Sequence, residues 1–256
     1  MAKHVLNYEI SGSGPVVVLL HGYLSALRYW DDVRPELATN HTVITIDLLG
    51  FGGSPKPRKS NYDYDDHLRW LDNTLRSLDL DEPFVLAGHS MGALLALRYS
   101  LAHPNHIRRL LLMNPPLFKN AREARHQLSS SIFYKASLYW QLHRVIVPVM
   151  RLPVMKKLVR TALPPKYKGM EKYVFQSSVE SRHRSLRNVI EAQESLYDLR
   201  RLNIPTTIVQ GLQERPKYLE NLLQVQAKPG LEIVLTDSGH HTPLDNAQLT
   251  YDLLQA

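Results

Sequence analysis

The sequence predicts an α/β fold in which a mostly parallel, doubly wound sheet carries an inserted helical cap. Short runs of apolar residues, bounded by turn residues, recur near both ends of the chain, with helical patterns between them. Runs that are apolar at nearly every position are typical of strands buried on both faces, as in a parallel sheet. Strands that alternate with helices indicate βαβ units, and the interruption of this alternation between residues 118 and 198 indicates an insertion.

Six segments are predicted to form strands of this sheet. Each is followed within a few residues by Gly, Asp or Asn, which favour turns. They span residues 15–20, 42–46, 84–87, 110–113, 206–210 and 231–235.

Three helices are predicted around these strands. In residues 64–80 four leucines lie three or four positions apart, on one face of a helix. A second helix is expected from about Met91 to Ala102, because Pro104 follows, and a third begins at about Asn246. The predicted core therefore comprises residues 1–117 and 199–256, and the predicted cap comprises residues 118–198.

The composition is that of a globular protein, with 256 residues, 44% of them hydrophobic and 21% charged. The absence of Cys excludes a disulfide framework, a cysteine zinc site and a cysteine nucleophile. The first residues lack the apolar stretch of a secretory signal, and the longest apolar runs fall short of the roughly 20 residues of a membrane span. We therefore expect a soluble, cytoplasmic protein.

The formal charge of +7 is unevenly distributed. Residues 118–198 contain 15 Lys and Arg against 6 Asp and Glu, whereas the remaining chain contains 16 against 18. A basic protein suggests nucleic acid, a membrane surface or an acidic substrate as partner. The excess charge here belongs to the predicted cap.

Ser90 is the predicted nucleophile. It lies in Gly88-His89-Ser90-Met91-Gly92, a Gly-x-Ser-x-Gly pattern placed between a predicted strand and a predicted helix. Such a tight turn requires small residues two positions before and after the serine, and both are Gly. The Met91 N–H, at the start of the helix, is expected to stabilise an oxyanion.

His240 is the predicted general base, because a serine hydroxyl needs a base near the end of another strand. It follows Gly239 just beyond the last predicted strand. The adjacent His241 is expected to point elsewhere, and His21, followed by Gly22, is expected to shape its loop.

Glu214 is the predicted acid that orients the base. It lies three residues after Gly211, and its position gives the chain order Ser, Glu, His that is expected with this turn. The competing acids are Asp198, Glu220 and Asp237, of which the first two fall in predicted helices and the third is expected to serve its own turn.

The second oxyanion donor is expected from the loop after the first predicted strand, His21-Gly22-Tyr23-Leu24, where the Tyr23 N–H is the candidate.

Together these motifs resemble the α/β-hydrolase family, in its serine-nucleophile branch of esterases and lipases. His21-Gly22 looks like the oxyanion loop, residues 47–54 like the loop after the next strand, residues 88–92 like the nucleophile elbow, and Gly239-His240 like the histidine loop. The family usually carries Asp where Glu214 stands here. Its dehalogenases and epoxide hydrolases use Asp at the nucleophile position, so Ser90 argues against both.

The resemblance implies a covalent acyl-enzyme, formed by attack of Ser90 and released by water, with His240 as base and then acid. We expect a serine hydrolase of carboxylic esters with small or medium acyl groups, or of lactones, working without metal or cofactor. The alternatives are another acyl or carbon–carbon bond hydrolase with the same triad, and a hydrolase-like receptor that signals through its cap.

The inserted segment resembles the cap that roofs the active site in this family. Its aromatic and aliphatic residues, Phe133, Tyr134, Tyr139, Trp140, Leu152, Val154, Met155 and residues 145–150, alternate with Lys and Arg. The simplest interpretation is that the apolar faces pack on the core while the cations are solvated. The alternatives are weak contact with an anionic membrane and an anionic acyl substrate. We expect a small-molecule ester as partner, no nucleic acid, and a monomer or homodimer.

Overall fold

A single seven-stranded sheet forms the centre of the molecule. The computed structural model describes residues 4–130, 145, 148–149, 152–162 and 171–255. The strand order is β1-β3-β2-β4-β5-β6-β7, and every neighbouring pair is parallel except β1 and β3. The strands are β1 (Tyr8–Ser11), β2 (Val16–Leu20), β3 (Thr42–Ile46), β4 (Phe84–His89), β5 (Ile107–Met113), β6 (Thr206–Gly211) and β7 (Leu231–Thr236). The predicted fold class is confirmed.

The antiparallel edge strand β1 is absent from the sequence prediction. Its four residues, Tyr-Glu-Ile-Ser, are partly buried or exposed, and they do not form a continuous apolar run. A sheet edge with one side open to solvent does not need the continuous apolar pattern of the central strands. The other six strands agree with the prediction to within three residues at each end.

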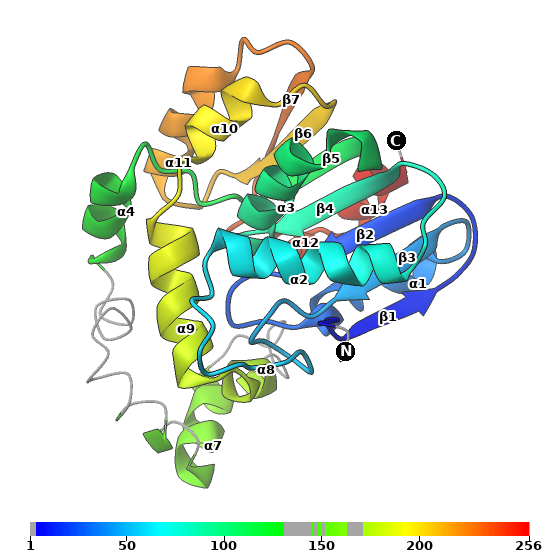
Figure 1. The fold of residues 1–256 in the computed structure, drawn as a ribbon. Coiled ribbons are helices and arrows are strands. Elements are labelled where there is room, and N and C mark those ends of the chain that lie inside the picture. Colours follow the sequence, from blue (N-terminus) through cyan, green and yellow to red (C-terminus); the bar gives the residue numbers. More distant parts are fainter. Residues whose placement is uncertain (1–3, 131–144, 146–147, 150–151, 163–170, 256) are drawn as a thin grey trace.

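Helices cover both faces of the sheet (Figure 1). Strand residues alternate between the two faces: Val18, Ile44 and Leu86 pack in one apolar cluster, whereas Val17, Val43 and Val85 pack in the other. The first cluster is covered by α2 (Tyr64–Ser77), α3 (Met91–Ala102) and α10 (Ser195–Arg201). The second is covered by η1 (Leu27–Trp30), α1 (Arg34–Leu37) and α13 (Ala247–Gln255).

The remaining short helices lie in the connections. They are η2 (Pro104–His106), α11 (Pro216–Leu222), η5 (Leu223–Val225) and α12 (Thr242–Asp245). Within the described part of the chain, every helix is too short or too polar to span a bilayer.

The described parts of the connection between β5 and β6 consist of helices joined by turns and irregular residues, without a strand. We call residues 118–198 the β5–β6 segment. It contains α4 (Ala121–Leu128), α7 (Pro153–Ala162), α8 (Glu171–Gln176), α9 (Val179–Ser185), the π-helical turn η4 (Leu186–Glu191) and the first part of α10. Phe133, Tyr134, Tyr139 and Trp140, which the sequence analysis singled out, lie outside the described residues.

The two ends of the β5–β6 segment are joined to each other and to the core. The buried side chain of Gln193 donates to the carbonyl of Pro116 (2.7 Å) and accepts from the Phe118 N–H (3.3 Å). On α10, Asp198 forms an ion pair with Arg98 of α3 at 2.7 Å. The segment therefore begins and ends on the face of the sheet that α2, α3 and α10 cover.

Candidate active site

The turn between β4 and α3 holds Ser90 in a strained conformation. Its φ of 54° and ψ of −118° lie outside the regions that side chains with a Cβ prefer. A Cβ at Gly88 would lie 2.3 Å from the Gly92 carbonyl oxygen, and a Cβ at Gly92 would lie 2.4 Å from that of His21. Both glycines are therefore required by contact, as the sequence pattern indicates, and the turn is fixed by the backbone around it.

Ser90, His240 and Glu214 form one chain of hydrogen bonds, although they lie on three separate loops. The Nε2 atom of His240 is 2.9 Å from Ser90 Oγ, and its Nδ1 atom is 2.5 Å from Glu214 Oε1. With Nδ1 protonated and donating to the carboxylate, Nε2 is left to accept the Ser90 proton. Glu214 has only 3% of its side chain exposed, whereas His240 has 38% exposed. The acid is enclosed, and the base remains accessible.

Two buried amides hold the Glu214 carboxylate from the side opposite His240. Its Oε2 atom accepts from Gln210 Nε2 (2.6 Å) and from Asn114 Nδ2 (2.8 Å), and the same Asn114 nitrogen donates to the Gly239 carbonyl (3.2 Å). Donors to a carboxylate stabilise its charged form. The sequence analysis missed both residues. A signal was present for Gln210, because it is a polar residue in an otherwise apolar, buried strand end.

The acid loop and the histidine loop touch at Gly211. A Cβ on this residue would lie 2.5 Å from the carbonyl oxygens of Ser238 and Gly239. Glycine at the end of β6 therefore allows the two loops to come close enough for Glu214 to reach His240.

The loop after β2 lies beside Ser90. A Cβ on Gly22 would lie 3.1 Å from Ser90 Cβ and 2.9 Å from His89 Nδ1. Tyr23 follows, and its hydroxyl donates to the Arg182 carbonyl on α9 (2.9 Å). Met91 is the first residue of α3, so its N–H belongs to the first turn, where helix donors have no intrahelical acceptor. Met91 thus directly follows Ser90, and Gly22, the residue before Tyr23, lies beside it.

A sequence profile of the alpha/beta hydrolase fold matches residues 15–247, which include every residue of the hydrogen-bonded chain. The chain belongs to the α/β-hydrolase family.

Curated relatives of this hydrolase match it over less than half of its length. A probable lysophospholipase of Arabidopsis thaliana, BODYGUARD 2, is 34% identical over 108 residues, which are 40% of this chain and 23% of the relative. A fluoroacetate dehalogenase of a Burkholderia species is 35% identical over 113 residues, 43% of this chain and 37% of the relative. The matched part is therefore a minority of each of these relatives.

Solved structures resemble this hydrolase over almost all of its length. MenH from Staphylococcus aureus superposes with a TM-score of 0.77 at 21% identity, covering 97% of this chain and 96% of that one. An esterase from Exiguobacterium antarcticum superposes with a TM-score of 0.76 at 20% identity, covering 98% and 94%. At these identities the likeness establishes the fold.

The other acids that the sequence analysis weighed are engaged elsewhere in the hydrolase. Asp237 accepts from Gln213 Nε2 on the surface (2.9 Å). Asp198 pairs with the Arg98 guanidinium, and Glu220 pairs with Lys217. Of the four carboxylates considered, Glu214 alone contacts His240 in the described structure.

His21 shapes its loop, as its sequence context suggests. The Leu48 N–H donates to its Nε2 atom (3.0 Å), so the proton is on Nδ1, which donates to the Gly22 carbonyl (2.7 Å). Burial lowers the pKa of His21, which Asp47 only partly opposes. A neutral imidazole with both nitrogens engaged takes no part in proton transfer.

His89, next to Ser90, supports the loop that carries His240. Its Nε2–H donates to the His240 carbonyl (2.6 Å), and its ring stacks on Tyr29 at 4.5 Å. Burial and the neighbouring His240 and His241 lower the pKa of His89 well below its usual value. The Tyr29 hydroxyl also lies 3.3 Å from His241 Nδ1, so the His241 ring contacts Tyr29.

The described residues contain one group of side chains with metal-binding potential, and it lies at the far end of α3 from Ser90. It comprises Asp72, His103 and His106. Asp72 is already paired with Arg76 Nε (2.7 Å), and the Tyr99 hydroxyl lies 3.4 Å from both Asp72 and His106. Because protein neighbours occupy its ligand atoms, we assign no metal to this group.

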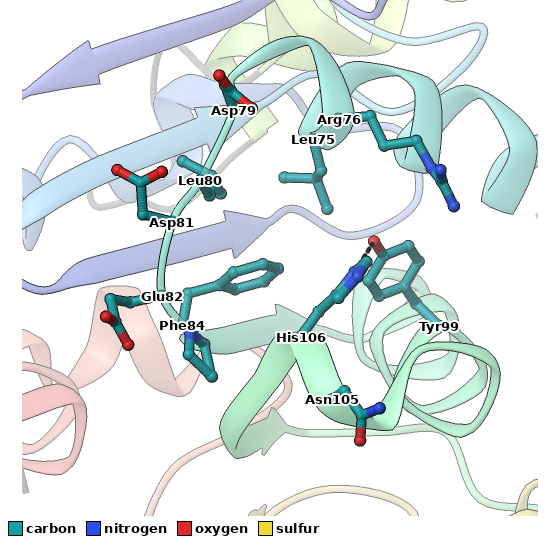
Figure 2. Close-up of a pocket in the computed structure, with 11 residues that line it drawn as sticks. Leu75, Arg76, Asp79, Leu80, Asp81, Glu82, Phe84, Tyr99, Asn105 and His106 are labelled. Atoms are coloured by element: carbon teal, nitrogen blue, oxygen red, sulfur yellow. Dashed lines mark hydrogen bonds between the residues drawn. The ribbon is translucent and has the colours of Figure 1, made fainter.

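A cleft of about 300 Å³ opens beside that group (Figure 2). The connection from α2 to β4 lines one wall with Asp79, Asp81 and Glu82, and Asn105 and His106 line another. These residues lie just before the amino-terminal ends of β4 and β5. Ser90, Glu214 and His240 lie just after the carboxyl-terminal ends of β4, β6 and β7. The cleft is therefore separate from the candidate active site.

Proposed function

We propose that this α/β hydrolase cleaves carboxylic esters through an acyl-enzyme on Ser90. The observation that carries the proposal is the continuous hydrogen-bonded chain from Ser90 Oγ through His240 to Glu214, with links of 2.9 and 2.5 Å. This is the geometry in which a base takes the serine proton while a buried acid holds its tautomer and stabilises the imidazolium.

In the acylation half, Ser90 Oγ attacks the ester carbonyl carbon as His240 Nε2 takes its proton. The Met91 and Tyr23 N–H groups are the proposed donors to the resulting oxyanion. When the tetrahedral intermediate collapses, the bond to the alcohol oxygen breaks, and the imidazolium gives its proton to the departing alcohol. The products of this half are the free alcohol and the Ser90 acyl ester.

In the deacylation half, His240 takes a proton from water, and the hydroxide oxygen attacks the acyl carbon. Collapse of the second tetrahedral intermediate breaks the bond to Ser90 Oγ, which recovers its proton from His240. The acid is released and the enzyme is regenerated. Glu214, held by Gln210 and Asn114, remains a carboxylate throughout.

The substrate class is an ester with a small or medium acyl group, or a lactone. A probable lysophospholipase among the relatives is, by its name, an ester hydrolase. The related fluoroacetate dehalogenase acts on a different bond, and the serine at position 90 favours acyl transfer over that chemistry.

A chain-length series of aryl esters tests the proposal. We expect turnover by the unaltered enzyme, and a loss of about 10⁶-fold in kcat for Ser90→Ala, because the nucleophile is gone. Ser129→Ala, which removes a hydroxyl from the solvent-exposed end of α4, is the matched control and should keep full activity. Equal rates for Ser90→Ala and Ser129→Ala would refute the acyl-enzyme.

Parallel assays with thioesters and vinylogous diketones distinguish the other hydrolytic reactions of the same triad. Faster turnover of either class would replace the ester in the proposal and leave the catalytic residues unchanged. Turnover below about one per minute on every class, together with ligand binding, would favour a receptor instead.

A further inference from the structure

Exposed apolar side chains are concentrated in one stretch of the described sequence. Ten large hydrophobic side chains are exposed in the described structure, and half of them lie between residues 145 and 158. They are Val145, Val149, Leu152, Val154 and Leu158. Scattered exposed hydrophobic residues are ordinary, but a group of this kind marks a surface that binds something.

Helix α7 separates apolar from basic residues along its length. At 100° per residue, Val154 and Leu158 fall on one side of the helix, and Lys156, Lys157 and Arg160 fall on the other. Val154 and Leu158 are 61% and 55% exposed. In α2, by contrast, the apolar face that carries Leu71 and Leu75 is buried against the sheet. The apolar face of α7 has the residue pattern of a helix face that packs on a core, yet Val154 and Leu158 are exposed.

The charge of the surrounding chain has a single sign. Residues 124–170 contain nine Lys and Arg and no Asp or Glu. Three of those cations lie on α7 itself, and α7 lies apart from the sheet (Figure 1). An amphipathic helix with basic residues opposite its apolar face is the form in which proteins bind the interface of an anionic bilayer.

We propose that α7 binds the surface of an anionic phospholipid membrane, with Val154 and Leu158 entering the boundary between headgroups and acyl chains. Lys156, Lys157 and Arg160 then contact the phosphate and carboxylate groups of the lipids.

Two other occupants fit the surface less well. A second copy of the chain would bring two stretches with nine cations each against one another, which is repulsive. A soluble polyanion would match the charge but would leave Val154 and Leu158 exposed to water. An anionic bilayer is opposite in charge to the basic side of α7 and can bury its apolar side chains at the same time.

Cosedimentation with vesicles tests the proposal, using Ser90→Ala protein so that no lipid is consumed. We expect binding to phosphatidylcholine vesicles containing phosphatidylserine at least tenfold stronger than to phosphatidylcholine alone, and weaker binding as salt is raised. No pelleting with either vesicle, or equal pelleting with both, would overturn the proposal. Binding to heparin without binding to vesicles would replace the membrane by a soluble polyanion.

Two double variants separate the two sides of α7. Val154→Ser/Leu158→Ser and Lys156→Glu/Lys157→Glu should each lose at least tenfold in vesicle binding. Leu223→Ser and Lys59→Glu change an exposed leucine and an exposed lysine of the core, and they should bind as the parent does. Unchanged binding by either α7 variant would contradict the proposal. Circular dichroism of each variant confirms that its fold is intact.

The absence of Cys offers a second measurement that does not depend on disrupting binding. An environment-sensitive fluorophore on Leu158→Cys should shift its emission to the blue with anionic vesicles, and the same label on Lys59→Cys should not. Pelleting without a shift at position 158 would show that another surface binds. Neither measurement requires ester hydrolysis, so failure here leaves the proposed function intact, and failure of the proposed function leaves this inference intact.

Discussion

The core encloses the Glu214 carboxylate among hydrogen-bonding partners, whereas the β5–β6 segment, where it is described around α7, exposes apolar side chains among cations. In the core, Glu214 is enclosed and accepts hydrogen bonds from His240, Gln210 and Asn114. On α7, Val154 and Leu158 are more than half exposed. Hydrogen bonds between buried polar groups fix the positions of the side chains that make them. Exposed apolar side chains that lie together are typical of surfaces that bind a partner. The proposed chemistry thus belongs to the core, and the proposed membrane contact belongs to the β5–β6 segment.

The largest effect that tests this comparison is expected at Glu214. Glu214→Gln preserves the shape of the side chain but removes the charge that orients His240 and stabilises its imidazolium. We expect kcat for aryl esters to fall on the order of 10⁴-fold. Glu220→Gln, a surface carboxylate on α11 paired with Lys217, is the control. A loss below about tenfold at position 214 would move the acid's role to another carboxylate.

A smaller loss is expected when the support of the acid is removed. Gln210→Met keeps the volume of this buried side chain but deletes the donor 2.6 Å from Glu214 Oε2. A hydrogen bond to a charged group contributes enough for a loss of about 10-fold to 100-fold in kcat. Because Gln210 lies behind the acid, KM should stay constant. Gln213→Met removes an amide that bonds to Asp237 on the surface and serves as control; equal kcat values for the two variants would disprove a positioning role for Gln210.

Acidification is expected to lower the stability of the fold through a buried histidine between α2 and α9. The His67 ring of α2 is buried, with its Nε2 atom 3.2 Å from Ser185 Oγ, and burial lowers the pKa of His67 to about 3, against an opposing effect of Asp66 and a reinforcing one of His21. The unfolded chain binds this proton below about pH 6.5, and the folded chain does not. Stability from this group is therefore complete above pH 6.5 and is lost as the pH falls toward 3.

Protonation of this one group in the unfolded chain lowers the free energy of unfolding by about 2 kcal/mol at pH 5. Urea unfolding at pH 7 and pH 5 measures it. The unaltered protein should lose about 2 kcal/mol more between these values than His67→Gln, which stays neutral and can still bond to Ser185. If both proteins lost the same stability, His67 would not be the group responsible.

Much of the core could be predicted from the sequence, because local pattern and tertiary environment agree there. The helix expected at Met91 and Ala102 has those bounds, and six strands were located from their apolar runs. β1 was missed because an edge strand has a weak pattern. A helix was expected at Glu220, and α11 (Pro216–Leu222) lies there, but its bounds could not be predicted because seven residues give too little periodicity.

The support of the site was harder to predict than the site itself. Ser90, His240 and Glu214 occupy recognisable positions at strand ends, so their order along the chain was informative. Asn114 stands before Pro115 and Pro116 and resembles any turn residue. Its role arises only because β5, β6 and β7 bring three separate loops together, and pairing between distant strands is not visible in a local pattern.

The joined ends of the β5–β6 segment allow it to be exchanged as a unit. Gln193 connects the entry to the exit through Pro116 and Phe118, and the Arg98–Asp198 pair attaches the exit to α3. A chimaera would replace only residues between Phe118 and Gln193 by the corresponding segment of another protein. The Gln193 hydrogen bonds and the Arg98–Asp198 pair would then be retained. The intervening sequence, including α7, can then change while the loops that carry Ser90, Glu214 and His240 keep their spacing.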